Sequence, residues 1–148
     1  MCGNGGASAI CEMATKVLDS WALMALFHDE PAAEEVERLL QKASAGTHEC
    51  LMSVVNWGEI YYSVMRGVSA EMAETKAKEI AAMPIELIPV ADDLQLVRQA
   101  AIFKATQRIS YADAFAAALA KLRRAELVTG DREFKVLAKE IRISWLKN

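Results

Sequence analysis

The chain has 148 residues, of which 53% are hydrophobic and 25% are charged, as expected of one globular domain. Its net charge of −3 and isoelectric point near 5.5 argue against a general polyanion binder, although several acids gathered at one site would leave the remaining surface less acidic. No apolar run reaches the roughly 18 residues of a membrane span, and the first residues lack a signal-peptide pattern. We therefore expect a cytoplasmic protein with no membrane segment.

Cysteine and histidine usage narrows the chemistry further. The three cysteines, Cys2, Cys11 and Cys50, form no CxxC pair, which indicates a reducing compartment and no zinc site. His28 and His48 are the only histidines, which argues against catalysis by a histidine pair.

The first element follows a glycine-rich start. Residues 1–14 are small and show no periodicity, so we expect a flexible N-terminal extension ahead of a single domain over residues 15–148. Val17 and Leu18 are consecutive apolar residues, typical of a strand that is covered on both faces. Asp19 follows them directly, and an apolar, helix-like stretch runs from Ser20 to Phe27.

The rest of the chain alternates between helical and strand patterns. Further helices are predicted at residues 31–43, 55–66, from 69, 94–105, 110–124 and 132–139, and further strands at 50–54, 84–90, 127–128 and 143–146. Such alternation implies parallel β-α-β crossovers. The predicted fold is therefore α/β, a three-layer α/β/α sandwich with a central parallel sheet.

Four acids stand out from this pattern. Asp19 and Asp131 each follow a predicted strand, and ligands of open α/β sheets bind at the carboxyl ends of strands. Gly130 would allow a sharp turn ahead of Asp131. Asp113 lies in the first turn of an alanine-rich helix, and Glu59 lies in the largely apolar helix at 55–66.

Each acid also has a purely structural interpretation. Asp19, or Ser20 beside it, and Asp131 are suited to capping the helices that follow them. The spacing of Ser110 and Asp113 matches a capping box. Glu59 is equally compatible with a solvent-facing position.

Together, the four acids favour a metal site. Clustered carboxylates repel one another, and a divalent cation removes that repulsion. Carboxylate oxygens without histidine or cysteine select Mg²⁺ or Mn²⁺.

These motifs resemble those of PIN-domain ribonucleases, and especially the VapC-type toxins of toxin–antitoxin pairs. The resemblance rests on Val17-Leu18-Asp19-Ser20, Asn56-Trp57-Gly58-Glu59-Ile60, Ser110 to Ala120 and Thr129-Gly130-Asp131-Arg132-Glu133-Phe134, in that order within about Thr15 to Trp145. It implies that the first and fourth strands are adjacent, and that the protein is an Mg²⁺- or Mn²⁺-dependent endoribonuclease, often a homodimer, inhibited by a cognate antitoxin protein.

The resemblance also assigns roles by position. It implies that Asp19, Glu59, Asp113 and Asp131 are the catalytic, metal-binding acids. Thr129 matches the family's supporting hydroxyl, and we expect Ser20 and Asn56 to support the site as well. Some members use a further acid near the fourth, which makes Glu133 another candidate.

The predicted reaction is hydrolysis of RNA by metal-activated water, which leaves a 5′-phosphate and a 3′-hydroxyl. The main alternative is a catalytically inactive PIN-like scaffold that binds protein. A phosphorylatable receiver-like domain shares the α/β pattern, but an adjacent acidic pair after the first strand is missing. We also predict an apolar groove near Trp21, Met24 and Phe27 that receives an antitoxin segment.

Overall fold

The computed structural model describes residues 13–148 and contains a five-stranded parallel sheet between two layers of helices. The elements in chain order are β1 (Ala14–Leu18), α1 (Ser20–Phe27), α2 (Ala33–Ser44), β2 (His48–Ser53), α3 (Val54–Gly67), α4 (Ala70–Ala81), β3 (Glu86–Ile88), α5 (Gln95–Thr106), α6 (Tyr111–Leu122), β4 (Glu126–Thr129), the 3₁₀ helix η1 (Arg132–Leu137) and β5 (Arg142–Trp145). The strand order is β3-β2-β1-β4-β5, with every neighbouring pair parallel. The predicted sandwich is confirmed, and β1 and β4 are adjacent as the resemblance implied.

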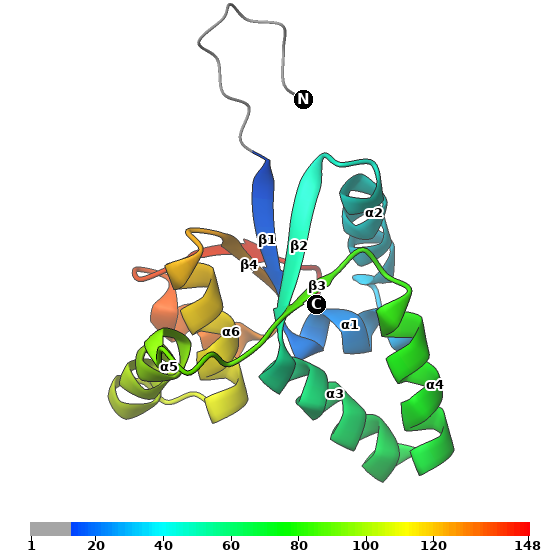
Figure 1. The fold of residues 1–148 in the computed structure, drawn as a ribbon. Helices are drawn as coiled ribbons and strands as arrows, with labels where there is room; N and C mark the ends of the chain where they lie inside the picture. The colour runs from blue at the N-terminus through cyan, green and yellow to red at the C-terminus, as the bar shows by residue number, and fades with distance from the viewer. Residues whose placement is uncertain (1–12) are drawn as a thin grey trace, which may run out of the picture.

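Each face of the sheet has its own hydrophobic core (Figure 1). Helices α1 to α4 cover one face, while α5, α6 and η1 cover the other. The two successive apolar residues of β1 divide between them, because strand side chains alternate: Val17 packs toward α6 and Leu18 toward α1. β1 is therefore buried on both sides, as its sequence predicts.

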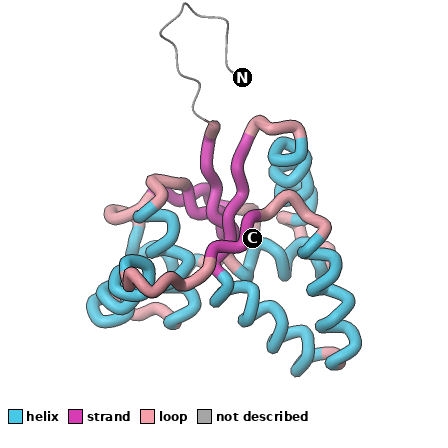
Figure 2. Tube along the Cα trace, viewed as in Figure 1, coloured by secondary structure: helices cyan, strands magenta, loops and turns pink. Residues whose placement is uncertain are grey.

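Small residues allow α6 to pack closely on the sheet. Its alanines at 114, 116, 117, 118 and 120 are all buried, together with Phe115 and Leu119. Ser53, Ser69 and Ser110 cap α3, α4 and α6, each accepting a hydrogen bond from a backbone N–H of the first turn. The helices surround strands whose carboxyl ends face a common side (Figure 2).

The structure differs from the predictions mainly at element ends. β3 covers only residues 86–88 of the predicted 84–90, because Pro84 and Pro89 have no N–H to donate to a neighbouring strand. The helix predicted at 132–139 is the shorter 3₁₀ helix η1, and α2 begins at Ala33, two residues after Pro31. Within the described residues, no helix has both the length and the apolar character needed to cross a membrane.

The predicted N-terminal extension falls almost entirely outside the described residues, since these begin at residue 13 and β1 begins at Ala14. Cys2 and Cys11 also lie outside them. Cys50 is buried and unpaired with another cysteine, and its burial raises the pKa of the thiol to about 11.

Candidate metal centre

The carboxyl ends of β1 and β4 form the base of the candidate site. Thr129, the last residue of β4, donates a hydrogen bond from Oγ1 to Oδ2 of Asp19 at 2.5 Å. The same Oγ1 accepts a hydrogen bond from the backbone N–H of Asp131 at 3.0 Å. One buried hydroxyl therefore joins the two acids that follow the two adjacent strands.

Both of these acids also cap the helices that follow them. Asp19 accepts a hydrogen bond from Ala22 N at 3.0 Å as the N-cap of α1, and Asp131 accepts one from Glu133 N at 3.0 Å as the N-cap of η1. The capping interpretation and the site interpretation are thus compatible. Each cap uses Oδ1 of its carboxylate; in Asp19 the second oxygen accepts the bond from Thr129, and a carboxylate oxygen can accept more than one bond.

Asp113 reaches the site from the other side of the sheet, in the first turn of α6. Ser110 caps this helix, with its Oγ accepting a hydrogen bond from Asp113 N at 3.1 Å. Asn56 at the start of α3 donates from Nδ2 to Ala112 O at 3.0 Å and so ties α3 to the first turn of α6. Asn56 is fully buried, and its Oδ1 has no hydrogen-bond partner within the described residues.

Glu59 lies one turn further along α3 and is half-buried. Its Oε1 accepts a hydrogen bond from the Ser20 hydroxyl at the start of α1. This contact connects α3 to the end of β1, so the two supporting polar residues predicted from sequence, Ser20 and Asn56, each join α3 to another element of the site.

The carboxylates that come closest together are those of Asp113, Asp131 and Glu133. Each offers an oxygen that lies within 4.8 Å of the other two. Asp19 and Glu59 are outside this group but near it, because the charges of Glu59 and Asp131 both act on Asp113, and those of Asp113 and Asp131 act on Asp19. The structure therefore brings the four predicted acids into one neighbourhood and adds Glu133 to it.

Burial and mutual repulsion disfavour the charged form of two of these acids. Burial raises the pKa of the Asp19 carboxyl to about 7, with the charges of Asp113 and Asp131 adding to the effect against the hydrogen bonds from Thr129 and Ala22. Burial raises the pKa of Asp113 to about 7 as well, followed by the charges of Asp131 and Glu59. A bound cation would reverse this penalty by stabilising the charged carboxylates.

These donors fit a hard divalent cation. They are all carboxylate oxygens, with no histidine or cysteine among the grouped acids, and such donors suit Mg²⁺ or Mn²⁺ better than zinc. Asp113, Asp131 and Glu133 are placed to hold one ion together. Asp19 is linked to this group by Thr129, whose hydroxyl donates to Asp19 and accepts from the Asp131 backbone N–H.

Two features of the site differ from the sequence-based expectations. Glu133, only a secondary candidate, joins the closest group because η1 follows Asp131 and its tight first turn returns Glu133 toward the acids. Gly130 lies in the short connection between β4 and η1, as predicted, but its φ is not positive, so the turn itself does not require glycine. Gly130 is required instead because the ring of Trp21 packs directly on it, in the space that a Cβ would occupy.

A family model described as the PIN domain matches residues 16–140, which include all of these acids. None of the curated proteins compared with the chain matches it. Several solved structures do share its fold.

Three of these structures are VapBC2 from Rickettsia felis bound to a DNA fragment from their promoter, DNA-bound VapBC from Salmonella typhimurium, and VapC20 from Mycobacterium tuberculosis, described as a Sarcin-Ricin loop cleaving toxin. The first is 17% identical, covers 90% of this chain and 99% of its own, and has a TM-score of 0.68. The second is 18% identical, covers 89% and 98%, and has a TM-score of 0.69. The third is 18% identical, covers 85% and 95%, and has a TM-score of 0.65.

At these identities the likeness concerns the fold, which extends over nearly the whole of both chains in each comparison. The family match spans most of the present chain and includes the strand ends that carry its acids. This chain therefore belongs to the PIN domain family.

Proposed function

We propose that this protein is a metal-dependent endoribonuclease that acts in the cytoplasm as the toxin of a toxin–antitoxin pair. The observation that carries the proposal is the convergence of Asp113, Asp131 and Glu133, with Asp19 and Glu59 beside them, at the strand ends of a PIN domain. Acids held this close at an energetic cost are typical of a functional site.

The protein's own residues hold and orient the site. Asp113, Asp131 and Glu133 would bind Mg²⁺ or Mn²⁺, with Asp19 and Glu59 as further candidate ligands. When bound, this ion would activate water and stabilise negative charge on the scissile phosphate. Thr129 fixes Asp19 and Asp131 relative to each other, so that their carboxylates are positioned before substrate arrives.

Glu59 and Asn56 position the part of the site that α3 and α6 form. Asn56 holds the first turn of α6 through Ala112, and Ser20 orients the Glu59 carboxylate toward α1. Because burial raises the pKa of both Asp19 and Asp113 to about 7, the protonation of these two acids would respond to occupancy of the site near neutral pH. The substrate we propose is RNA.

The partners follow from the same assignment. The solved relatives include VapBC complexes, which suggest by analogy that a small antitoxin binds this chain, and we propose that the toxin is a homodimer. We propose that the antitoxin binds near α1, where Trp21 and Met24 line one hollow and Leu26 and Phe27 line another. All four side chains are partly exposed.

Cleavage of RNA by the purified full-length chain tests this function. Total cellular RNA would be incubated with Mg²⁺ or Mn²⁺ and with EDTA, and cleavage sites would be mapped by adapter ligation that requires a 5′-phosphate. We expect cleavage with metal, none in EDTA, and recovery on adding metal back. Asp113→Asn should abolish cleavage, while Asp92→Asn, which neutralises an exposed acid before α5, should not.

The chemistry is then tested at a mapped site. A substrate with one 2′-deoxy nucleotide immediately 5′ of the scissile phosphate should still be cut, because the nucleophile is water and not the 2′-hydroxyl. Ends carrying a 2′,3′-cyclic phosphate, made equally well in EDTA, would contradict the proposal.

An inactive scaffold is the alternative function. Calorimetric titration with Mn²⁺ distinguishes an active nuclease from an inactive scaffold, because a protein without catalytic activity does not need to bind the metal. We expect saturable binding that Asp19→Asn weakens at least tenfold. Equal Mn²⁺ affinity of the wild type and Asp19→Asn would favour the scaffold.

A further inference from the structure

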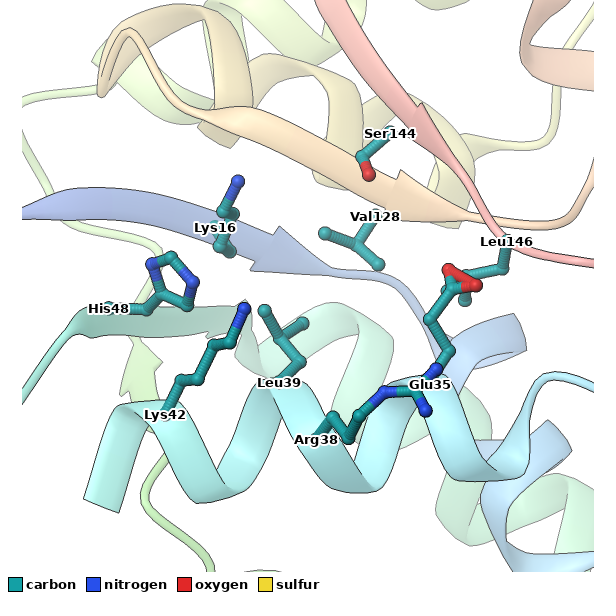
Figure 3. Close-up of a pocket in the computed structure, with 9 residues that line it drawn as sticks. All are labelled: Lys16, Glu35, Arg38, Leu39, Lys42, His48, Val128, Ser144 and Leu146. Carbon is teal, nitrogen blue, oxygen red and sulfur yellow. The ribbon is translucent and has the colours of Figure 1, made fainter. Parts of the chain in front are cut away.

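A second polar cavity lies away from the acids, between α2 and the sheet face that α1 to α4 cover (Figure 3). Its volume is about 190 Å³. The lining side chains come from α2 and from four strands, and they are Lys16, Glu35, Arg38, Leu39, Lys42, His48, Val128, Ser144 and Leu146. Leu39, Val128 and Leu146 form its apolar part, while the remaining side chains are polar or charged.

The charges of this cavity are divided between its two ends. Lys16, Lys42 and His48 lie at one end, and Glu35 and Arg38 lie at the other, with the Glu35 carboxylate beside Leu146 (Figure 3). Lys16 Nζ forms an ion pair with Glu126 at 2.8 Å. Lys42 belongs to none of the ion pairs found among the described residues, so its charge is available to an incoming anion.

His48 supplies a second, independent sign that this end lacks a partner. Its Nδ1 is buried, yet no group of the described residues forms a hydrogen bond with it. Such atoms are uncommon in proteins, because leaving a buried polar atom unpaired costs roughly 1–3 kcal/mol. Burial and the positive charges of Lys16 and Lys42 lower the pKa of His48, against the smaller opposite effect of the Glu126 carboxylate.

We propose that the end of this cavity formed by Lys16, Lys42 and His48 binds a single phosphate group. The lysines supply charged N–H donors, and the His48 imidazole lines the cavity beside them. The cavity is smaller than the roughly 300–1,000 Å³ of typical small-molecule sites, which limits the bound group to about the size of one phosphate. This site is separate from the acid cluster, which repels anions.

The phosphate has two plausible sources, a free phosphate ion and a phosphate of bound RNA, and both present the same oxyanion. Titration with inorganic phosphate tests the chemistry they share. The full-length protein would be studied in EDTA at constant ionic strength, with affinity measured by calorimetry and the imidazole signals by NMR. The chain contains only two histidines, so exposed His28 at the end of α1 serves as an internal control.

We expect saturable binding of phosphate that shifts the His48 imidazole signals and leaves those of His28 in place. Lys42→Met should weaken binding about tenfold, the loss expected on removing one charge-assisted hydrogen bond. Lys78→Met is the matched control, because Lys78 is an exposed lysine of α4 outside the cavity. The affinity of Lys78→Met for phosphate should equal that of the wild type.

The outcomes are decisive in both directions. Equal loss of affinity in Lys42→Met and Lys78→Met would show that phosphate responds only to net charge, and it would overturn the proposal. Absence of a saturable shift at His48 would overturn it as well. If binding is confirmed, displacement of phosphate by a 5′-hydroxyl RNA pentanucleotide assigns the site to RNA, and failure to displace it assigns the site to free phosphate.

Discussion

Neutralising Asp113 should stabilise the metal-free protein, although it destroys the proposed activity. Asp113→Asn keeps the size and shape of the side chain and removes the charge that burial and the neighbouring acids disfavour. The effect must depend on pH, because only the ionised wild-type carboxyl carries the penalty.

The size of the effect follows from the pKa of this group. Folding raises the pKa from 3.8 to about 7, so the folded state holds its proton over a pH range in which the unfolded chain has lost it. The free energy of unfolding of the wild type therefore falls as the pH rises from about 4 to about 7. At about 1.4 kcal/mol per pKa unit, the total loss is about 4 kcal/mol above pH 7, and none of it is present well below pH 4.

Urea unfolding of wild type and Asp113→Asn at pH 4 and pH 8, in EDTA, measures this difference. We expect the variant to gain at least about 2 kcal/mol over the wild type between the two pH values. Asp92→Asn should show a change within about 0.5 kcal/mol, because Asp92 is exposed. A gap between wild type and Asp113→Asn that stays constant from pH 4 to pH 8 would refute the electrostatic account of this site.

Adding metal to the same experiment should narrow the difference between wild type and Asp113→Asn at pH 8. Mn²⁺ at 100 times its dissociation constant stabilises a folded protein by about 2.7 kcal/mol. Only the wild type keeps the full set of carboxylates, so its gain in the free energy of unfolding at pH 8 should exceed that of Asp113→Asn.

Three further substitutions test other parts of the structure. Gly130→Ala places a Cβ against the tryptophan ring of α1 and should lower the free energy of unfolding by about 1–3 kcal/mol in urea; unchanged stability would show that the ring moves freely. Thr129→Val removes the hydroxyl that joins two acids and should cost about 1–3 kcal/mol at pH 7, whereas Thr129→Ser should restore most of it; equal stability of both variants would argue against the hydroxyl's role. Phe27→Ala should weaken binding of the cognate antitoxin, measured by calorimetry, at least tenfold. Ile102→Ala, an exposed control on α5, should leave the affinity unchanged. Unchanged affinity for Phe27→Ala would place the groove elsewhere.

Much of the sheet was predictable, because buried parallel strands have an uninterrupted apolar pattern and are followed directly by helices. Val17, Leu18, Leu127 and Val128 are buried as that pattern implies, and the acid after each strand identified the edge where the site forms. The adjacency of the first and fourth strands came from the family resemblance, and the rest of the strand order from the structure, since local periodicity carries no information about which strands pair.

The sequence was less informative where the position of a side chain depends on contacts distant in the chain. Glu133 resembles any exposed acid in a helical pattern, and only the short turn after Asp131 shows that it joins the group. The unpaired nitrogen of His48 likewise depends on how α2 lies over the sheet, which no local pattern of residues around His48 reveals.

The central place of β1 determines when the site can form during synthesis. Asp19 emerges early from the ribosome, but the hydroxyl that fixes it belongs to Thr129, 110 residues further along the chain. A nascent chain that ends before β4 contains Asp19, Glu59 and Asp113. It lacks β4 itself, and with it Asp131, which follows that strand. The carboxylate group therefore assembles only after β4 and η1 have been made, so a chain truncated before β4 should lack the proposed metal site.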